Sequence, residues 1–171
     1  LVARSTLKDV WHRHIVDSAQ IFKLASGEVD HWADLGSGGG FPGMVIAIVA
    51  KEKVTPKRVS LVESDTRKCT FLRTVAREIG VKVRIINARI EDCPPLNADV
   101  LSARALTDLS TLLAFADQHL AQRGQALFLK GSTWAKELED AQTAWHFFHD
   151  VVKSKTEEGP AILRISGVSR V

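Results

Sequence analysis

The chain has 171 residues, of which 45% are hydrophobic and 25% are charged, the composition of one ordinary globular domain. No apolar run is long enough to cross a bilayer, and the first residues, LVARSTLKDV, lack the apolar stretch of a signal peptide. The formal net charge of +3 permits an anionic partner but does not require one. Cys69 and Cys93 have neither metal-binding nor redox spacing, so we expect a reducing, cytoplasmic location and no metal site.

The first predicted element is a helix over residues 7–26, where apolar side chains recur with helical spacing and Gly27 provides a stop. Strands and helices alternate after it, because apolar runs of strand length are separated by capped, amphipathic stretches. The predicted order is strand 29–35, helix 42–50, strand 58–63, helix 64–80, strand 81–87, strand 98–104, helix 107–124, strand 125–131, helix 133–145, and strands 146–155 and 161–168.

This alternation predicts an α/β fold with a mostly parallel, twisted sheet and helices on both faces. The last two strands have no helix between them and are joined by a turn at residues 158–160. We therefore expect an antiparallel hairpin at one edge of the sheet.

The segment DLGSGGGFPG, residues 34–43, lies between the first strand and the next helix, and five of its ten residues are glycine. Such a turn brings backbone N–H groups and a helix N-terminus close to a nucleotide. Two patterns overlap here. Residues 38–43 match the dinucleotide pattern G-x-G-x-x-G, whereas Asp34, Gly36 and Gly38 match the D-x-G-x-G turn of methyltransferases that use S-adenosylmethionine.

The charge of the ligand distinguishes the two patterns. S-adenosylmethionine has an ammonium and a sulfonium and no phosphate, so the carboxylate of Asp34 would attract it and would repel a pyrophosphate. Pro42 removes a backbone donor where a phosphate would need one. Both features favour S-adenosylmethionine, with S-adenosylhomocysteine as product, over a nicotinamide dinucleotide.

Further polar residues follow the ends of the next strands, at the edge where an open parallel sheet binds its ligand. Glu63 ends the second strand. It lies about as far along the sequence from the glycine loop as the acid that binds ribose hydroxyls in either class of protein. After the third strand, Ile90 with Glu91 or Asp92 could meet the adenine edge. Arg104 ends the fourth strand, where a charged side chain after an apolar run needs an anionic or aromatic partner.

Six motifs in chain order together resemble the RsmG/GidB family of bacterial methyltransferases, which act on N7 of a guanine in 16S ribosomal RNA. They are RHIVDS (13–18), DLGSGGGFPG (34–43), LVESDTRKCTFLR (61–73), NARIED (87–92), SARAL (102–106) and LKG (129–131). The resemblance implies a Rossmann-like class I methyltransferase in one domain, 1–171. Residues 1–26 would then be the remainder of an N-terminal helical segment and 27–171 the core.

The resemblance also implies roles for single residues. It places Gly36, Phe41, Ile90, Glu91 and Arg104 at the positions where the family binds its methyl donor, S-adenosylmethionine. It places Glu63 at the position of the acid that binds the ribose of this donor. Guanine N7 has a free in-plane lone pair, so the reaction needs positioning rather than a catalytic base or cysteine. For positioning the guanine we consider Arg104 together with Arg13, His14 and Asp17 of the RHIVDS motif.

The expected partner is 16S rRNA or the small ribosomal subunit, bound by a monomer of this chain without a membrane or a metal. Arg67, Lys68 and Lys130 are candidates for contacts with RNA phosphates. Three alternatives remain open at this point. They are a methyltransferase acting on a small molecule or a protein, an NAD-binding oxidoreductase, and a non-catalytic RNA-binding module.

Overall fold

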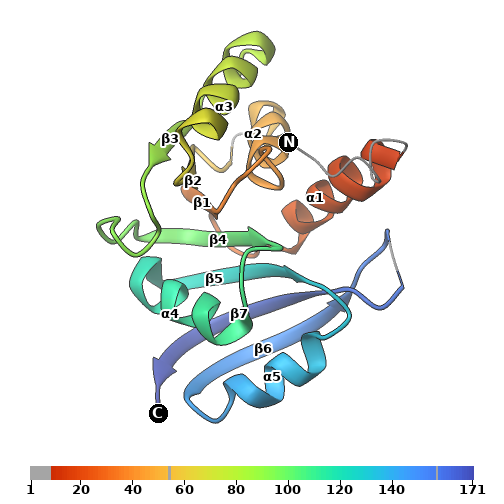
Figure 1. The fold of residues 1–171 in the computed structure, drawn as a ribbon, viewed down its shortest axis with the longest axis vertical. Coiled ribbons are helices and arrows are strands. Elements are labelled where there is room, and N and C mark those ends of the chain that lie inside the picture. Colours follow the sequence, from red (N-terminus) through yellow and green to blue (C-terminus); the bar gives the residue numbers. More distant parts are fainter. Residues whose placement is uncertain (1–8, 54, 157) are drawn as a thin grey trace.

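A computed structural model describes residues 9–53, 55–156 and 158–171 and is built around one central sheet (Figure 1). Within these residues the sheet has seven strands in the order β3-β2-β1-β4-β5-β7-β6. In chain order they are β1 (His31–Leu35), β2 (Arg58–Glu63), β3 (Arg84–Asn87), β4 (Ala98–Arg104), β5 (Leu120–Lys130), β6 (Trp145–Lys153) and β7 (Ala161–Arg170).

The first five strands are all parallel, whereas β7 is antiparallel to both β5 and β6. The predicted parallel sheet with an antiparallel C-terminal hairpin is therefore confirmed. The strand order 3-2-1-4-5 reverses direction between β1 and β4, and open sheets of this kind bind ligands at the carboxyl ends of the strands beside that switch point.

Helices cover both faces of the sheet (Figure 1). The helical bounds are α1 (Asp17–Gln20), α2 (Gly43–Glu52), α3 (Thr66–Ile79), α4 (Leu109–His119) and α5 (Trp134–Ala141). On one face, Trp32, Leu61 and Val100 pack against α2, α3 and the helical segment of residues 11–24, and on the other face Ala33 and Leu101 pack against α4 and α5.

The N-terminal helical segment, residues 11–24, is a continuous helix of changing pitch. It is π-helical over Trp11–Val16, α-helical over α1 and 3-10 over Ile21–Leu24. The predicted helix over 7–26 is thus present but ends at Leu24, two residues earlier than predicted. Its residues 7 and 8 lie outside the described part of the chain. Ile21 and Ser18 are fully buried, which anchors this segment over the sheet.

Helix α3 begins and ends as its sequence predicts. The side chain of Asp65 accepts hydrogen bonds from the backbone N–H groups of Arg67 (2.8 Å) and Lys68 (3.2 Å), so it caps the helix. Gly80 adopts φ 67°, the left-handed conformation that ends helices. The helix thereby starts three residues after Glu63 and has its N-terminus at the carboxyl end of the sheet.

The predictions for two other helices were wrong at their ends. The helix predicted over 107–124 is capped by Asp108 rather than Thr107, and it stops at His119. Leu120 already pairs with Ala98 of β4, and after a register shift the pairing continues with Gln125 opposite Val100, so this stretch follows β4 instead of continuing the helix. The stretch lies so close to β4 that a Cβ atom at Gly124 would approach the Ala98 carbonyl oxygen to 2.7 Å. Likewise α5 ends before Trp145, which begins β6 and is buried in the core.

Candidate active site

A pocket of about 620 Å³ opens at the carboxyl ends of β1, β2 and β4, beside the switch point of the sheet. It unites segments that are far apart in the sequence. The glycine loop forms one wall of the pocket. The end of β2 and the loop after β3 form a second wall, and the end of β4 with the start of α4 forms a third. Predicted donor-binding residues that line it are Gly36, Gly38, Phe41, Glu63, Ile90, Glu91 and Arg104.

Asp34 is not among the lining residues, because it lies fully buried beneath the glycine loop. Its Oδ2 accepts a hydrogen bond from the backbone N–H of Gly43 (3.1 Å), and its Oδ1 accepts one from the hydroxyl of Ser102 (2.7 Å). Burial raises the pKa of Asp34 to about 6, although these hydrogen bonds and the charge of Arg104 oppose the shift. Asp34 therefore ties the start of α2 to β1 and β4, and its charge would act on a ligand through the loop.

The close contact between the loop and β1 explains the glycine at position 43. A Cβ atom there would overlap Leu61 Cδ2 and would come within 2.6 Å of Asp34 Cβ. At Gly36, where φ is +64°, a Cβ atom would meet Leu106 Cδ1 at 2.5 Å. Only glycine permits both the conformation and the approach, so the loop can pass directly over the strand ends.

We expect Gly43→Ala to lower the free energy of unfolding by about 1–3 kcal/mol, because the methyl group must displace Leu61 or Asp34. Gly131→Ala is the matched control, since a Cβ atom at Gly131 meets nothing within 4 Å. Its effect should remain within about 0.5 kcal/mol. Urea unfolding of both variants measures the difference, and equal stabilities would refute the packing argument.

Glu63 lines the pocket at the end of β2 and is buried. Its Oε2 accepts a hydrogen bond from the N–H of Gly38, and its Oε1 accepts one from the N–H of Asp65, both at 2.9 Å. A carboxylate has about four acceptor positions, so further hydroxyl groups can still bind here. The ribose-binding role expected of Glu63 from the sequence stays a prediction.

The loop after β3 forms the opposite part of the pocket through Ala88, Arg89, Ile90 and Glu91. Ile90 is 8% exposed and its side chain belongs to the hydrophobic core, whereas Glu91 is exposed and lies 3.8 Å from Arg89 in an ion pair. The loop therefore offers backbone groups at a fixed position together with an accessible carboxylate. That combination suits the polar edge of an adenine.

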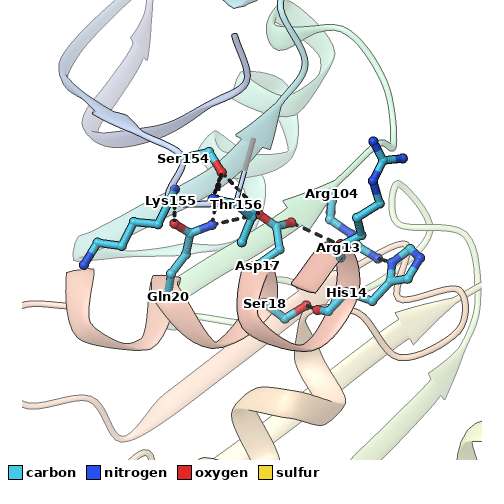
Figure 2. A network of polar contacts seen from close by, with 9 residues as sticks. All are labelled: Arg13, His14, Asp17, Ser18, Gln20, Arg104, Ser154, Lys155 and Thr156. Carbon is cyan, nitrogen blue, oxygen red and sulfur yellow. Dashed lines mark hydrogen bonds and ion pairs between the residues drawn. The ribbon is translucent and has the colours of Figure 1, made fainter. Parts of the chain in front are cut away.

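Arg104 joins the pocket to the N-terminal helical segment (Figure 2). One of its guanidinium nitrogens donates to the backbone carbonyl of Arg13 (3.0 Å) and lies 3.5 Å from Oδ2 of Asp17, and the other lies 2.9 Å from Nδ1 of His14. The guanidinium carbon lies 5.3 Å from the ring centre of Phe41. Of the four residues considered for positioning the guanine, His14 and Arg104 line the pocket, whereas Arg13 and Asp17 line a neighbouring hollow on the other side of Arg104. Arg13 contacts Arg104 through its backbone carbonyl, although 91 positions separate the two residues.

The cluster continues into the connection between β6 and β7, which the sequence did not suggest (Figure 2). Oδ1 of Asp17 accepts hydrogen bonds from Gln20 (2.7 Å) and from the hydroxyl of Thr156 (2.9 Å). Gln20 in turn accepts from the backbone N–H of Lys155 (3.1 Å). These contacts hold Asp17, and through it Arg104, in one orientation.

The three candidates for RNA phosphate contact have different surroundings. Lys68 lines the pocket and Arg67 is exposed beside it at the start of α3. Lys130 is only 9% exposed and pairs with Glu137 at 2.6 Å, while it donates to the carbonyl of Thr107 at 2.7 Å. The ammonium of Lys130 is thus paired with Glu137 within the protein. This position does not support the predicted contact with RNA.

The described ranges contain no group of three His, Cys, Asp or Glu side chains arranged to hold a metal ion. Among the same residues, none of the helices combines the length and the apolar character needed to span a bilayer. Cys69 and Cys93 are buried as free thiols, and burial raises the pKa of each.

The strand order and the antiparallel C-terminal hairpin are those of the class I methyltransferase fold. Among solved structures, the chain is similar to a ribosomal protein L11 methylase from Lactobacillus delbrueckii subsp. bulgaricus, with a TM-score of 0.69 and 20% identity, covering 91% of this chain and 79% of that one. A SAM dependent methyltransferase from Aquifex aeolicus gives a TM-score of 0.68 at 13% identity, over 96% and 99% of the two chains. Identities this low show the fold alone.

The sequence profile of the GidB family, described as rRNA small subunit methyltransferase G, matches residues 1–161, and the chain belongs to this family. The protein named ribosomal RNA small subunit methyltransferase G of Ruegeria sp. (strain TM1040) is 53% identical over all 171 residues, which cover 83% of its length. The protein of the same name from Cereibacter sphaeroides (strain ATCC 17025) is 46% identical over 100% of this chain and 82% of its own. Membership of this family shows that the ligand is S-adenosylmethionine and not a nicotinamide dinucleotide.

Proposed function

We propose that this protein transfers the methyl group of S-adenosylmethionine to N7 of a guanine in 16S rRNA. The observation that carries the proposal is the arrangement of one pocket around Glu63, the loop at Ile90 and Arg104, above the buried carboxylate of Asp34. The names of the family and of its relatives supply the class of RNA. We further infer that the protein works as a monomer in the cytoplasm, where ribosomal subunits are found.

Each part of the pocket has a distinct task in holding the donor. Glu63 would accept hydrogen bonds from the ribose hydroxyls, and the loop at Ile90 and Glu91 would contact the adenine. The methionine part would lie against Gly36 and Gly38, close to the negative charge of Asp34. When bound, S-adenosylmethionine supplies a methyl group on a positively charged sulfur.

The residues at the rim would hold the guanine rather than activate it. Because N7 is nucleophilic without losing a proton, the protein needs only to bring its lone pair into line with the methyl group. Arg104 lies over the ring of Phe41, and His14 packs against the same ring at 5.1 Å. A guanidinium and an aromatic ring offer flat surfaces on which an unstacked base can lie. Arg67 and Lys68 would contact the flanking phosphates.

The test is a methylation assay with labelled S-adenosylmethionine and small ribosomal subunits that lack the modification, run in parallel with naked 16S rRNA. Reduction and aniline cleavage would then locate 7-methylguanine. We expect incorporation at a single guanine in one or both substrates. No incorporation in either would refute the proposal, and transfer to a small molecule or a protein instead would establish the alternative substrate class.

A further inference from the structure

The first two turns of helix α4 border the donor pocket. Thr111 and Phe115 line the pocket, and His119 follows after another four residues, so that all three share one face of the helix. The last turn of α4 therefore reaches the loop after β3. Its two final residues, Gln118 and His119, have no part in the chemistry described above, yet His119 is fully buried.

These two residues bind three backbone carbonyls of the loop. Nε2 of His119 donates to the carbonyl of Ile90 at 3.0 Å. The amide nitrogen of Gln118 donates to the carbonyls of Glu91 (3.3 Å) and Cys93 (3.0 Å). Because a carbonyl oxygen only accepts, the imidazole must carry a proton on Nε2. Burial lowers the pKa of His119, which keeps the ring neutral at pH 7.

A packing role alone does not account for a histidine at this position. Nδ1 of His119 is buried and makes no hydrogen bond to any described residue. An unsatisfied polar atom in the core opposes folding, and a leucine would fill similar space without it. The gain must therefore come from the hydrogen bond to Ile90.

The bond to Ile90 fixes a peptide plane at the wall of the pocket. In a trans peptide the carbonyl of one residue and the N–H of the next point in opposite directions. Holding the carbonyl of Ile90 toward α4 thus directs the N–H of Glu91 away from α4. The turn bond from the N–H of Cys93 to the same carbonyl, at 3.1 Å, completes the fixed loop.

We propose that His119, assisted by Gln118, is a positioning residue that holds residues 90–93 in the shape that recognises the adenine of the donor. The proposal rests on the proposed function, because it takes the bound nucleotide to be S-adenosylmethionine or its product. It adds a residue that touches neither the donor nor the RNA and acts through the backbone of Ile90.

His31 provides a matched control within the same protein. It is 4% exposed, its Nε2 lies 2.8 Å from the hydroxyl of Ser60, and its Nδ1 is likewise buried without a hydrogen bond to described residues. Burial lowers its pKa too. However, His31 begins β1 and so lies at the amino end of the sheet, opposite the pocket.

The experiment titrates S-adenosylhomocysteine and its hypoxanthine analogue, S-inosylhomocysteine, into the full chain by calorimetry. We expect His119→Leu to weaken S-adenosylhomocysteine binding about tenfold and to reduce the preference for adenine over hypoxanthine. His119→Gln keeps an N–H donor and should restore much of both. His31→Leu should change the affinity by less than about twofold although it removes an equivalent buried bond.

Unchanged affinity and unchanged base preference in His119→Leu would overturn the proposal, as would an equal loss in His31→Leu. If His119→Leu does not fold, Gln118→Ala decides, because it deletes two of the three bonds to the loop from a partly exposed position. We expect severalfold weaker binding, and wild-type affinity would overturn the proposal. A wild-type protein that binds no S-adenosylhomocysteine would instead refute the proposed function.

Discussion

Replacement of Arg104 with alanine is expected to lower the rate of methyl transfer about 100-fold while weakening S-adenosylhomocysteine binding only a few-fold. Small errors in the placement of a reacting base have effects of this size when catalysis depends on orientation. Arg104 binds the Arg13 carbonyl and His14 and lies over Phe41, so its loss removes the contacts between the end of β4 and the N-terminal helical segment. It also leaves Asp17, whose side chain is 18% exposed, without its cationic partner.

Single-turnover assays with saturating RNA measure the rate, and calorimetry measures donor binding. Arg104→Lys should recover only part of the activity, because an ammonium cannot reproduce the planar set of donors that faces Arg13, His14 and Asp17. Arg164→Ala serves as control, since it breaks an arginine–aspartate pair with Asp150 on the β6–β7 hairpin. A rate in Arg104→Ala within threefold of that control would argue against a role in positioning the guanine.

The parts of the fold that local sequence determines were predicted well. The apolar run of β2 and the capped helix α3 lie where the sequence placed them, because Asp65 and Gly80 act on their immediate neighbours. Residues 120–124 were assigned to a helix, since nothing local in LAQRG favours a strand. The strand begins there because Leu120 pairs with Ala98 and Gln125 pairs with Val100, tertiary contacts that periodicity does not reveal.

The candidate site divides in the same way. The glycine loop and Glu63 follow from strand ends and glycine spacing, and the structure places both in the pocket. The need of Arg104 for an anionic or aromatic partner follows from its place after an apolar run, and Asp17 and Phe41 are such partners. The contact with the RHIVDS segment itself was not predicted. The contributions of Thr156 and His119 left no signal in the sequence, because a threonine in a turn and a histidine at a helix end are ordinary at such positions.

The second large effect concerns Asp34, whose buried charge opposes folding. Its pKa rises from 3.8 to about 6 in the folded protein, so the folded state prefers the protonated acid. The resulting stabilisation is fully present below about pH 3.8 and is lost as the pH rises through about 6, which amounts to about 3 kcal/mol by pH 7. Asp34→Asn should therefore lose this pH dependence and be at least as stable as the wild type at pH 7.5.

Because the ionised carboxylate of Asp34 lowers the stability of the fold, we expect its charge to contribute to ligand binding instead. A cationic donor above the loop would favour ionised Asp34, so the affinity of the wild type for S-adenosylmethionine should rise about tenfold between pH 5 and pH 7.5. S-adenosylhomocysteine lacks the sulfonium charge and should show a smaller rise. In Asp34→Asn the affinity for S-adenosylmethionine should be lower at pH 7.5 and nearly constant across this range.

Calorimetric titrations of both ligands at four pH values, with urea unfolding under the same conditions, separate the two effects. The side-chain amide that Asp34→Asn introduces can still accept from the N–H of Gly43, so the loop should keep its shape. A variant that binds both ligands like the wild type at every pH would show that the charge of Asp34 has no part in recognition. The carboxylate would then act only through its bonds to Gly43 and Ser102, and the preference for a cationic donor would have to arise elsewhere in the pocket.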